Sequence, residues 1–104
     1  MIRILMVTVV LMFSCAFTAQ AHTPLCSCFD NGDETITCEG GFSDGSSASG
    51  VTMRVESDNG TVLLEGKMNE DSEYTFDKPK GDYTVQFDAG EGHRISVLGK
   101  EIVE

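Results

Sequence analysis

The chain of 104 residues is poor in basic residues, lacks tryptophan and contains only two prolines. Seven Lys and Arg stand against 17 Asp and Glu, which gives a formal net charge of −10 at pH 7. Such an acidic surface repels phosphate backbones and anionic lipids, so we expect neither nucleic-acid binding nor membrane-surface binding. No window shows a sustained apolar stripe of helical period, and the eleven glycines are typical of a turn-rich β domain.

The only long hydrophobic run lies at the amino terminus and is typical of a cleavable signal peptide. Arg3 supplies a positive start, a nearly unbroken apolar stretch follows, and Ala19 and Ala21 are small residues of the kind that signal peptidase reads. The run is too short for a comfortable membrane span. We therefore expect residues 1–21 to be a signal-peptide helix that is removed. The mature protein would then have no membrane span and be periplasmic or secreted, where disulfides persist.

Short runs of alternating apolar and polar residues recur along the rest of the chain, which is the period of half-buried strands. Turn-forming residues separate the runs, and Asp58-Asn59-Gly60 is the strongest hairpin signal. The expected strands cover residues 35–42, 51–56, 62–65, 74–76, 83–87 and 94–98, with a short edge strand at 101–103. Strands of this length and spacing predict an all-β fold, a small antiparallel β-sandwich of about six to seven strands.

The expected organisation has three parts: the signal peptide at 1–21, a Cys-containing segment at 22–33 and the β-sandwich at 34–104. Apolar residues at alternate positions of the expected strands should point inward and form a thin core. These residues are Ile36, Phe42, Val51, Met53, Val55, Val62, Leu64, Tyr74, Phe76, Tyr83, Val85, Phe87, Ile95 and Val97. A disulfide or a bound metal would add stability to so small a domain.

Three cysteines remain once the leader, which carries Cys15, is removed, and an odd number cannot all pair within one chain. Cys26 and Cys28 are two residues apart, so an extended segment presents both sulfurs on one face. Cys38 follows across the turn at Asn31-Gly32, where a hairpin would bring one of the first two cysteines close to it. Two main interpretations stay open: a cross-strand disulfide, such as Cys28–Cys38, with one thiol left over, or a thiolate-rich metal site. Pairing between two chains or a redox role is a further alternative.

The two histidines stand at positions that suit metal ligands. Cleavage after Ala21 makes His22 the first residue, and its α-amine and imidazole together form a bidentate chelate for copper or nickel. His93 follows a Gly-Glu-Gly sequence at the entrance to an expected strand, and neutral imidazole suits nickel, copper, cobalt or zinc. The plainer interpretations are a frayed terminus for His22 and an ordinary surface residue for His93.

No arrangement of residues indicates a catalytic centre. The chain has no nucleophile-elbow motif, and no Ser-His-Asp or Cys-His pairing follows from the spacing. The Cys-x-Cys pair is not the Cys-x-x-Cys motif of redox proteins. The acidic turn at residues 30–34 lacks the spacing of a calcium loop. We therefore expect a protein that is not an enzyme.

Several motifs resemble known families. The sequences at residues 48–55, 60–66, 69–76 and 81–85 resemble those of a carboxypeptidase-regulatory-like, or transthyretin-like, β-sandwich module. A leader that ends in Ala21 before His22, together with Ala-Gly-Glu-Gly-His at residues 89–93, is similar to small periplasmic accessory proteins of energy-coupling-factor cobalt and nickel transporters. The resemblance implies that His22 and His93 contact the metal.

Together these observations predict a periplasmic metal-binding or metal-handling accessory protein, linked to nickel or cobalt uptake through membrane transporter components, with copper as the alternative metal. His22 and His93 would bind the ion, and Cys26 and Cys28 would add thiolates where they are not oxidised. The competing interpretation is a non-catalytic β-sandwich of the cell envelope that docks a partner protein, with a structural disulfide and no metal.

Overall fold

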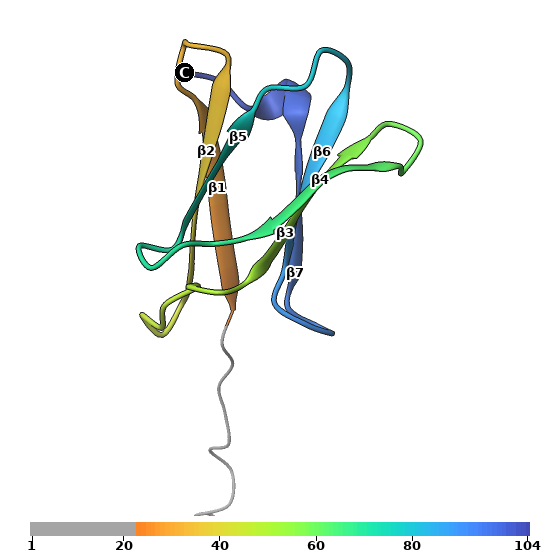
Figure 1. The fold of residues 1–104 in the computed structure, drawn as a ribbon. Helices are drawn as coiled ribbons and strands as arrows, with labels where there is room; N and C mark the ends of the chain where they lie inside the picture. The colour runs from red at the N-terminus through yellow and green to blue at the C-terminus, as the bar shows by residue number, and fades with distance from the viewer. Residues whose placement is uncertain (1–22) are drawn as a thin grey trace, which may run out of the picture.

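A computed structural model describes residues 23–104, and the expected signal peptide and His22 lie outside them. The described chain is a small sandwich of two antiparallel sheets, as the sequence predicts (Figure 1). The first sheet has the order β1 (Pro24–Asp30), β2 (Thr35–Phe42), β5 (Glu73–Asp77). The second has the order β4 (Val62–Lys67), β3 (Thr52–Ser57), β6 (Tyr83–Asp88), β7 (Arg94–Leu98). Among residues 23–104, no helix is long and apolar enough to cross a membrane.

The predicted hairpin forms between β3 and β4. The N–H of Ser57 donates to the carbonyl of Thr61 at 2.8 Å, and the N–H of Gly60 donates back to the carbonyl of Ser57 at 3.0 Å. Gly60 has a φ of 87°, a left-handed conformation that glycine adopts without steric cost. The local turn signal therefore predicted this connection correctly.

The Cys-containing segment is built into the sandwich as β1, which was not among the expected strands. It pairs with β2 along its whole length, from Pro24 opposite Phe42 to Asp30 opposite Ile36. Its alternation is reversed from the usual pattern, because apolar Leu25 points outward and is 51% exposed, whereas the cysteines point inward. A search for inward aliphatic residues therefore misses this strand.

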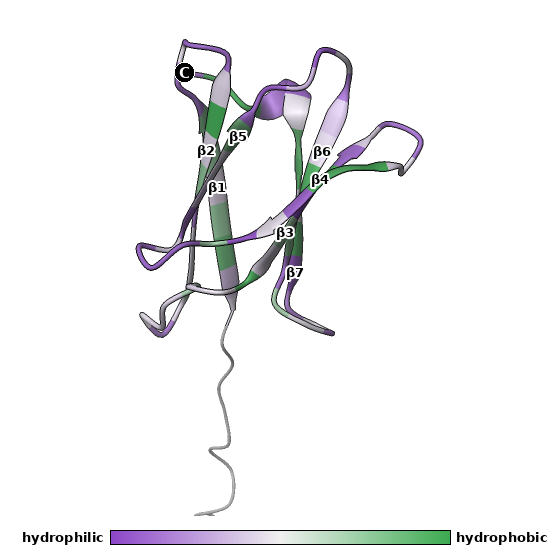
Figure 2. Cartoon of the chain, in the orientation of Figure 1, coloured by the Kyte–Doolittle hydropathy of each residue, from purple (hydrophilic) through white to green (hydrophobic). Residues whose placement is uncertain are grey.

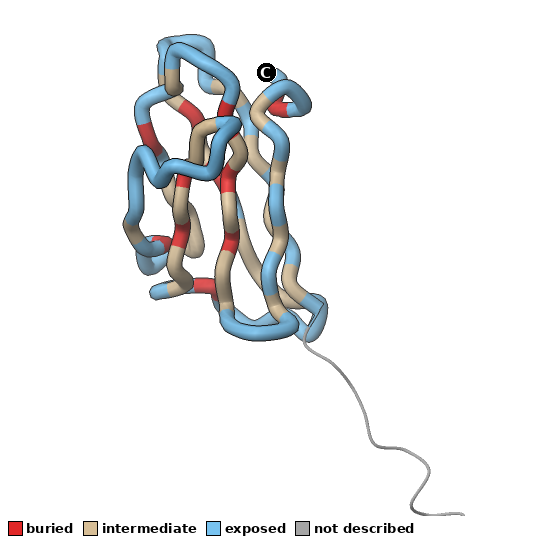
Figure 3. Tube along the Cα trace, turned by 90° about the vertical axis from the view of Figure 1, so that its right-hand side faces the viewer, coloured by how far each residue is buried: buried red, intermediate tan, exposed pale blue. Residues whose placement is uncertain are grey.

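The core lies between the sheets, where buried residues alternate along the central strands β2, β3 and β6 (Figure 3). Figure 2 shows hydrophobic residues along the same strands. Its members are Ile36, Cys38, Ala48, Met53, Val55, Met68, Phe76, Tyr83, Val85, Phe87 and Ile102. The expectation that Val62 and Leu64 point into the core is wrong, since they are 48% and 39% exposed. They lie on β4, the outer strand of a four-stranded sheet, and the facing sheet has only three strands to cover it.

The expected edge strand at 101–103 is also absent from the described chain. A short 3-10 turn, η1 (Gly99–Glu101), replaces it and is closed by the N–H of Ile102 donating to the carbonyl of Gly99 at 3.0 Å. Ile102 turns into the core, and the carbonyl of Val103 accepts a 3.0 Å hydrogen bond from the N–H of Asp30. The carboxyl-terminal segment thus closes one end of the sandwich instead of extending a sheet.

Candidate functional site

Three sulfur atoms meet on the inner face of the β1–β2 pair. The Sγ atoms of Cys26, Cys28 and Cys38 all lie within 4.8 Å of one another. Cys26 and Cys28 both point inward from β1, as expected for residues two apart in a strand, and Cys38 on β2 is fully buried. Within residues 23–104, this is the one group of three or more His, Cys, Asp or Glu side chains placed to hold a metal ion.

Two of these sulfurs are joined, which confirms the expected cross-strand disulfide. Cys28 and Cys38 face each other directly in the β1–β2 register, with Cα atoms 4.0 Å apart, and form the disulfide. The register also explains the choice between the two candidates, because Cys26 faces Gly40 instead. A sulfur in a disulfide carries no thiolate charge, so Cys28 becomes a metal ligand only after reduction.

Cys26 is the free thiol of the described chain. Burial raises its pKa to about 11, because the surrounding apolar groups disfavour the charged thiolate. At neutral pH the group is therefore a protonated thiol and a weak nucleophile. A metal ion would have to displace that proton, so binding at this sulfur releases a proton.

A fourth sulfur, that of Met68, lies against Gly40, the residue opposite Cys26, and no motif in the sequence indicated it. Gly40 faces Cys26 across the strands, and a Cβ atom at Gly40 would stand 2.6 Å from the Sδ of Met68. Met68 is 3% exposed and lies between β4 and β5, outside every expected strand. A thioether is a soft donor like a thiolate, so the surroundings of Cys26 are rich in sulfur.

His93 lies in the turn between β6 and β7 and is half-buried. Its Nδ1 is 3.2 Å from the carbonyl oxygen of Glu91. Since a carbonyl only accepts, Nδ1 carries the proton in this contact, which leaves Nε2 with a lone pair for a metal. The structure does not bring this ring into one group with the cysteines.

An ion-pair network fixes the turn that carries His93. Asp88 accepts hydrogen bonds from Arg54 on β3 and from Arg94 on β7, the latter at 3.0 Å, and from the N–H of Gly90 at 3.0 Å. These donors lower the pKa of Asp88 to about 2, with the Arg54 guanidinium as the largest cause. The carboxylate therefore ties the last residue of β6 to both neighbouring strands.

The beginning of β1 lies at the same end of the sandwich as His93. β1 and β7 are outer strands of different sheets that lie side by side. The hydrogen bond from Asp30, at the end of β1, to Val103, beyond the end of β7, means that both strands run in the same direction. Thr23 and His93 therefore share one end of the sandwich, the end at which β1 begins in Figure 1.

No protein-family model, curated protein or solved structure matches the chain. The resemblance to transporter accessory proteins and to transthyretin-like modules therefore stays a prediction from short motifs. The functional proposal has to rest on the chemistry of the site.

Proposed function

We propose that this protein is a metal-binding protein of the cell envelope that holds a transition-metal ion at its three cysteines when they are reduced. The observation that supports this most directly is the approach of three Sγ atoms to within 4.8 Å of one another. Metal–sulfur bonds of about 2.3 Å in a tetrahedral site place thiolates about 3.8 Å apart. After reduction the Sγ atoms of Cys28 and Cys38, which are bonded to each other in the disulfide, have to move apart to that distance, and Cys26 has to approach them by about 1 Å at most.

The two histidines supply an entry point for the metal in this proposal. A strand rise of about 3.3 Å per residue puts Cys26 about 10 Å along β1 from Thr23. His22 directly precedes Thr23 in the sequence, and His93 stands at the same end of the fold. Imidazole and the amino terminus would receive the ion, and Cys26 is the first sulfur on the way to Cys28 and Cys38.

The metal is cargo in this proposal, not a catalytic cofactor. Nickel and cobalt are the metals that the sequence motifs imply, with membrane transporter components as the partners that supply or accept them. Copper is the alternative, because thiolates and the nearby Met68 thioether favour a soft ion such as Cu(I). The same protein serves to test all three ions.

The test is a titration of the mature protein beginning at His22, once with the disulfide intact and once after reduction with a phosphine. Co(II) should give a thiolate-to-cobalt charge-transfer band with the reduced protein and none with the oxidised protein, and Ni(II) and Cu(I) follow in parallel. Cys26→Ala and Cys38→Ala should each weaken binding at least about tenfold. Ser27→Ala is the matched control, since Ser27 lies between Cys26 and Cys28 but points outward.

A reduced protein that takes up none of the three ions would contradict the proposal. The entry point is tested separately by adding one residue before His22 and by His93→Ala. Both changes should slow metal uptake by the reduced cluster, and unchanged rates would remove the histidines from the path.

The second candidate is a protein-docking module, and the edge strand β4 favours it. Val62, Leu63 and Leu64 are consecutive and 48%, 46% and 39% exposed. An exposed apolar edge strand is a template for pairing with another chain. The titration separates the two functions, because a docking module with a purely structural disulfide binds no metal after reduction.

A further inference from the structure

The outer face of the sheet formed by β1, β2 and β5 carries large apolar side chains that stay exposed. Leu25 and Phe29 on β1 point away from the core and are 51% and 36% exposed. Gly41 faces Leu25 on β2 and has no side chain to cover it. The two apolar residues are about 13 Å apart along the strand, at a rise of about 3.3 Å per residue. Only the small Ser27 points outward between them, which leaves room above it for an apolar side chain of another molecule.

The charged residues of this sheet are all acidic. Its strands contain no Lys or Arg, and their charged residues are Asp30, Glu39, Glu73 and Asp77. The strands of the other sheet balance three basic residues against three acidic ones, namely Arg54, Lys67 and Arg94 against Glu56, Glu65 and Asp88. One sheet is thus acidic and the other is neutral.

Two carboxylates on the acidic sheet stand directly opposite each other. Glu39 on β2 faces Glu73 on β5 in the strand register, so the two side chains lie on the same outer face. Neither forms an ion pair with any residue from 23 to 104. Like charges directly opposite each other destabilise a sheet. A cation that binds between them would remove this cost.

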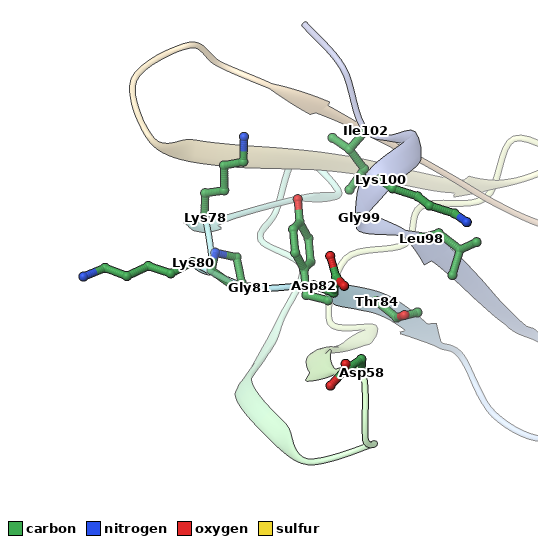
Figure 4. A pocket seen from close by; sticks show the side chains of 12 residues that line it. Asp58, Lys78, Lys80, Gly81, Asp82, Thr84, Leu98, Gly99, Lys100 and Ile102 are labelled. Carbon is green, nitrogen blue, oxygen red and sulfur yellow. The ribbon is translucent and has the colours of Figure 1, made fainter.

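The lysines outside the strands lie elsewhere. Lys78, Lys80 and Lys100 line a pocket between the β5–β6 connection, the start of β6 and η1 (Figure 4). Asp58 and Asp82 lie along the same pocket and offset part of its positive charge. Positive charge for the two glutamates therefore has to come from outside the described chain.

The apolar residues and the two glutamates form one continuous surface. Ser27 is directly opposite Glu39, so Ser27, Glu39 and Glu73 make one row across the three strands. Neighbouring strands are about 4.8 Å apart. An apolar side chain placed over Ser27 contacts Leu25 and Phe29, and a lysine or arginine beside it reaches both carboxylates.

We infer that the outer face of the β1–β2–β5 sheet docks a basic segment of a partner protein that carries apolar side chains beside its lysines or arginines. The apolar part packs between Leu25 and Phe29, and the cation binds Glu39 and Glu73. The inference does not depend on metal binding, because the cysteines lie on the inner face of the same sheet. It also concerns a different surface from the exposed edge of β4.

The first test compares three short peptides of equal length by amide chemical shifts and calorimetry with the mature, disulfide-bonded protein. One alternates lysine with leucine, one lysine with serine and one glutamate with leucine, which separates the charge from the apolar contact. The lysine–leucine peptide should bind most tightly, shift the amides of Leu25, Ser27, Glu39 and Glu73, and bind more weakly as salt is added. The inference is overturned if either other peptide binds as tightly, if the lysine–leucine peptide does not bind, or if its shifts lie on another face.

The charged half of the surface is tested by Glu39→Gln. This change should weaken binding of the lysine–leucine peptide about two- to fivefold, as expected for an exposed ion pair. Asp58→Asn is the matched control, because it removes the same charge from an exposed position in the turn between β3 and β4. Equal effects of the two changes would mean that the peptide senses only the net charge and would contradict the inference.

The apolar half is tested by Leu25→Ser. Loss of the apolar contact should weaken binding of the same peptide about three- to tenfold. Val62→Ser is the matched control, because it removes a similarly exposed apolar side chain, 48% against 51%, from β4. Unchanged affinity of Leu25→Ser, or an equal loss in Val62→Ser, would contradict the inference.

Discussion

At the scale of single residues, the partner on a neighbouring strand decides the chemical state of the cysteines and of Asp88. Cys26 and Cys28 lie two residues apart on the same face of β1, yet one is a free thiol and the other is half of a disulfide. The difference arises from the residues opposite them on β2, which are Gly40 and Cys38. Asp88 is a similar case, because its arginine partners come from two other strands.

Asp88 gives a prediction about acid stability. Its folded-state pKa of about 2 lies below the ordinary value of 3.8. A carboxylate with a lowered pKa stabilises the folded state above its ordinary pKa, and this contribution is lost as the pH falls toward 2. Asp88→Asn should therefore lower stability at pH 7 and flatten the loss of stability between pH 4 and pH 2, measured by urea unfolding. Asp71→Asn is the control, because Asp71 is exposed and makes no ion pair with residues 23–104. A pH profile of Asp88→Asn like that of the unmodified protein would contradict the prediction.

At the scale of elements, β2 shows how neighbouring residues face different surroundings. Gly40 points inward, where a Cβ atom would meet the Met68 Sδ at 2.6 Å and the Phe87 Cε2 at 2.7 Å. Gly41 points outward, and its nearest such contact is the carbonyl oxygen of Ser46 at 3.9 Å. Side chains of β6 and of the β4–β5 connection thus fill the space where β2 lacks a side chain.

This difference predicts opposite outcomes for two adjacent substitutions. Gly40→Ala should destabilise the protein by about 1–3 kcal/mol, because the added methyl group displaces Met68 and Phe87 in a packed core. Gly41→Ala should change stability by less than about 0.5 kcal/mol, as is usual for surface positions. Denaturant unfolding of the two variants, with the disulfide intact, measures both changes in the free energy of unfolding. Similar losses for the two variants would show that the clash at Gly40 relaxes freely.

At the scale of the whole molecule, the carboxyl-terminal segment holds parts of both sheets together. Ile102 packs into the core at 9% exposure, Val103 bonds to the end of β1, and Gly99 passes under the ring of Tyr83. A Cβ atom at Gly99 would lie 2.6 Å from that ring, so only glycine permits this path. The segment therefore contributes to the sandwich although it forms no strand.

Ile102 and Val103 test this role of the segment. Ile102→Ala should cost about 2–3 kcal/mol, because it leaves a cavity between the sheets. Val103→Ala should have little effect, since Val103 is 68% exposed and its contribution comes from the backbone carbonyl. Thermal unfolding of the two variants measures both changes in stability. Equal melting temperatures for the two variants would mean that Ile102 does not anchor the segment.

The sequence by itself determined the elements that depend on local rules. Period-two alternation predicted the bounds of β2 and β7 to the residue, and those of the other four expected strands to within a few residues. Gly60 marked the β3–β4 hairpin. Both predictions succeed because near neighbours in the sequence set which way a strand residue faces and which conformation a turn adopts. The spacing of Cys26 and Cys28 likewise predicted two sulfurs on one face.

Only the tertiary structure decided which groups meet across the fold. It paired Cys38 with Cys28, left Val62 and Leu64 uncovered, brought Met68 beside Gly40, and placed Lys78 and Lys100 along the same pocket. These contacts join residues far apart in the chain and depend on strand order and on three strands facing four. The alternation of apolar and polar residues along one strand does not reveal the strand order or the number of strands in the facing sheet. It shows only which face of the sheet a residue lies on, and not which residue it contacts.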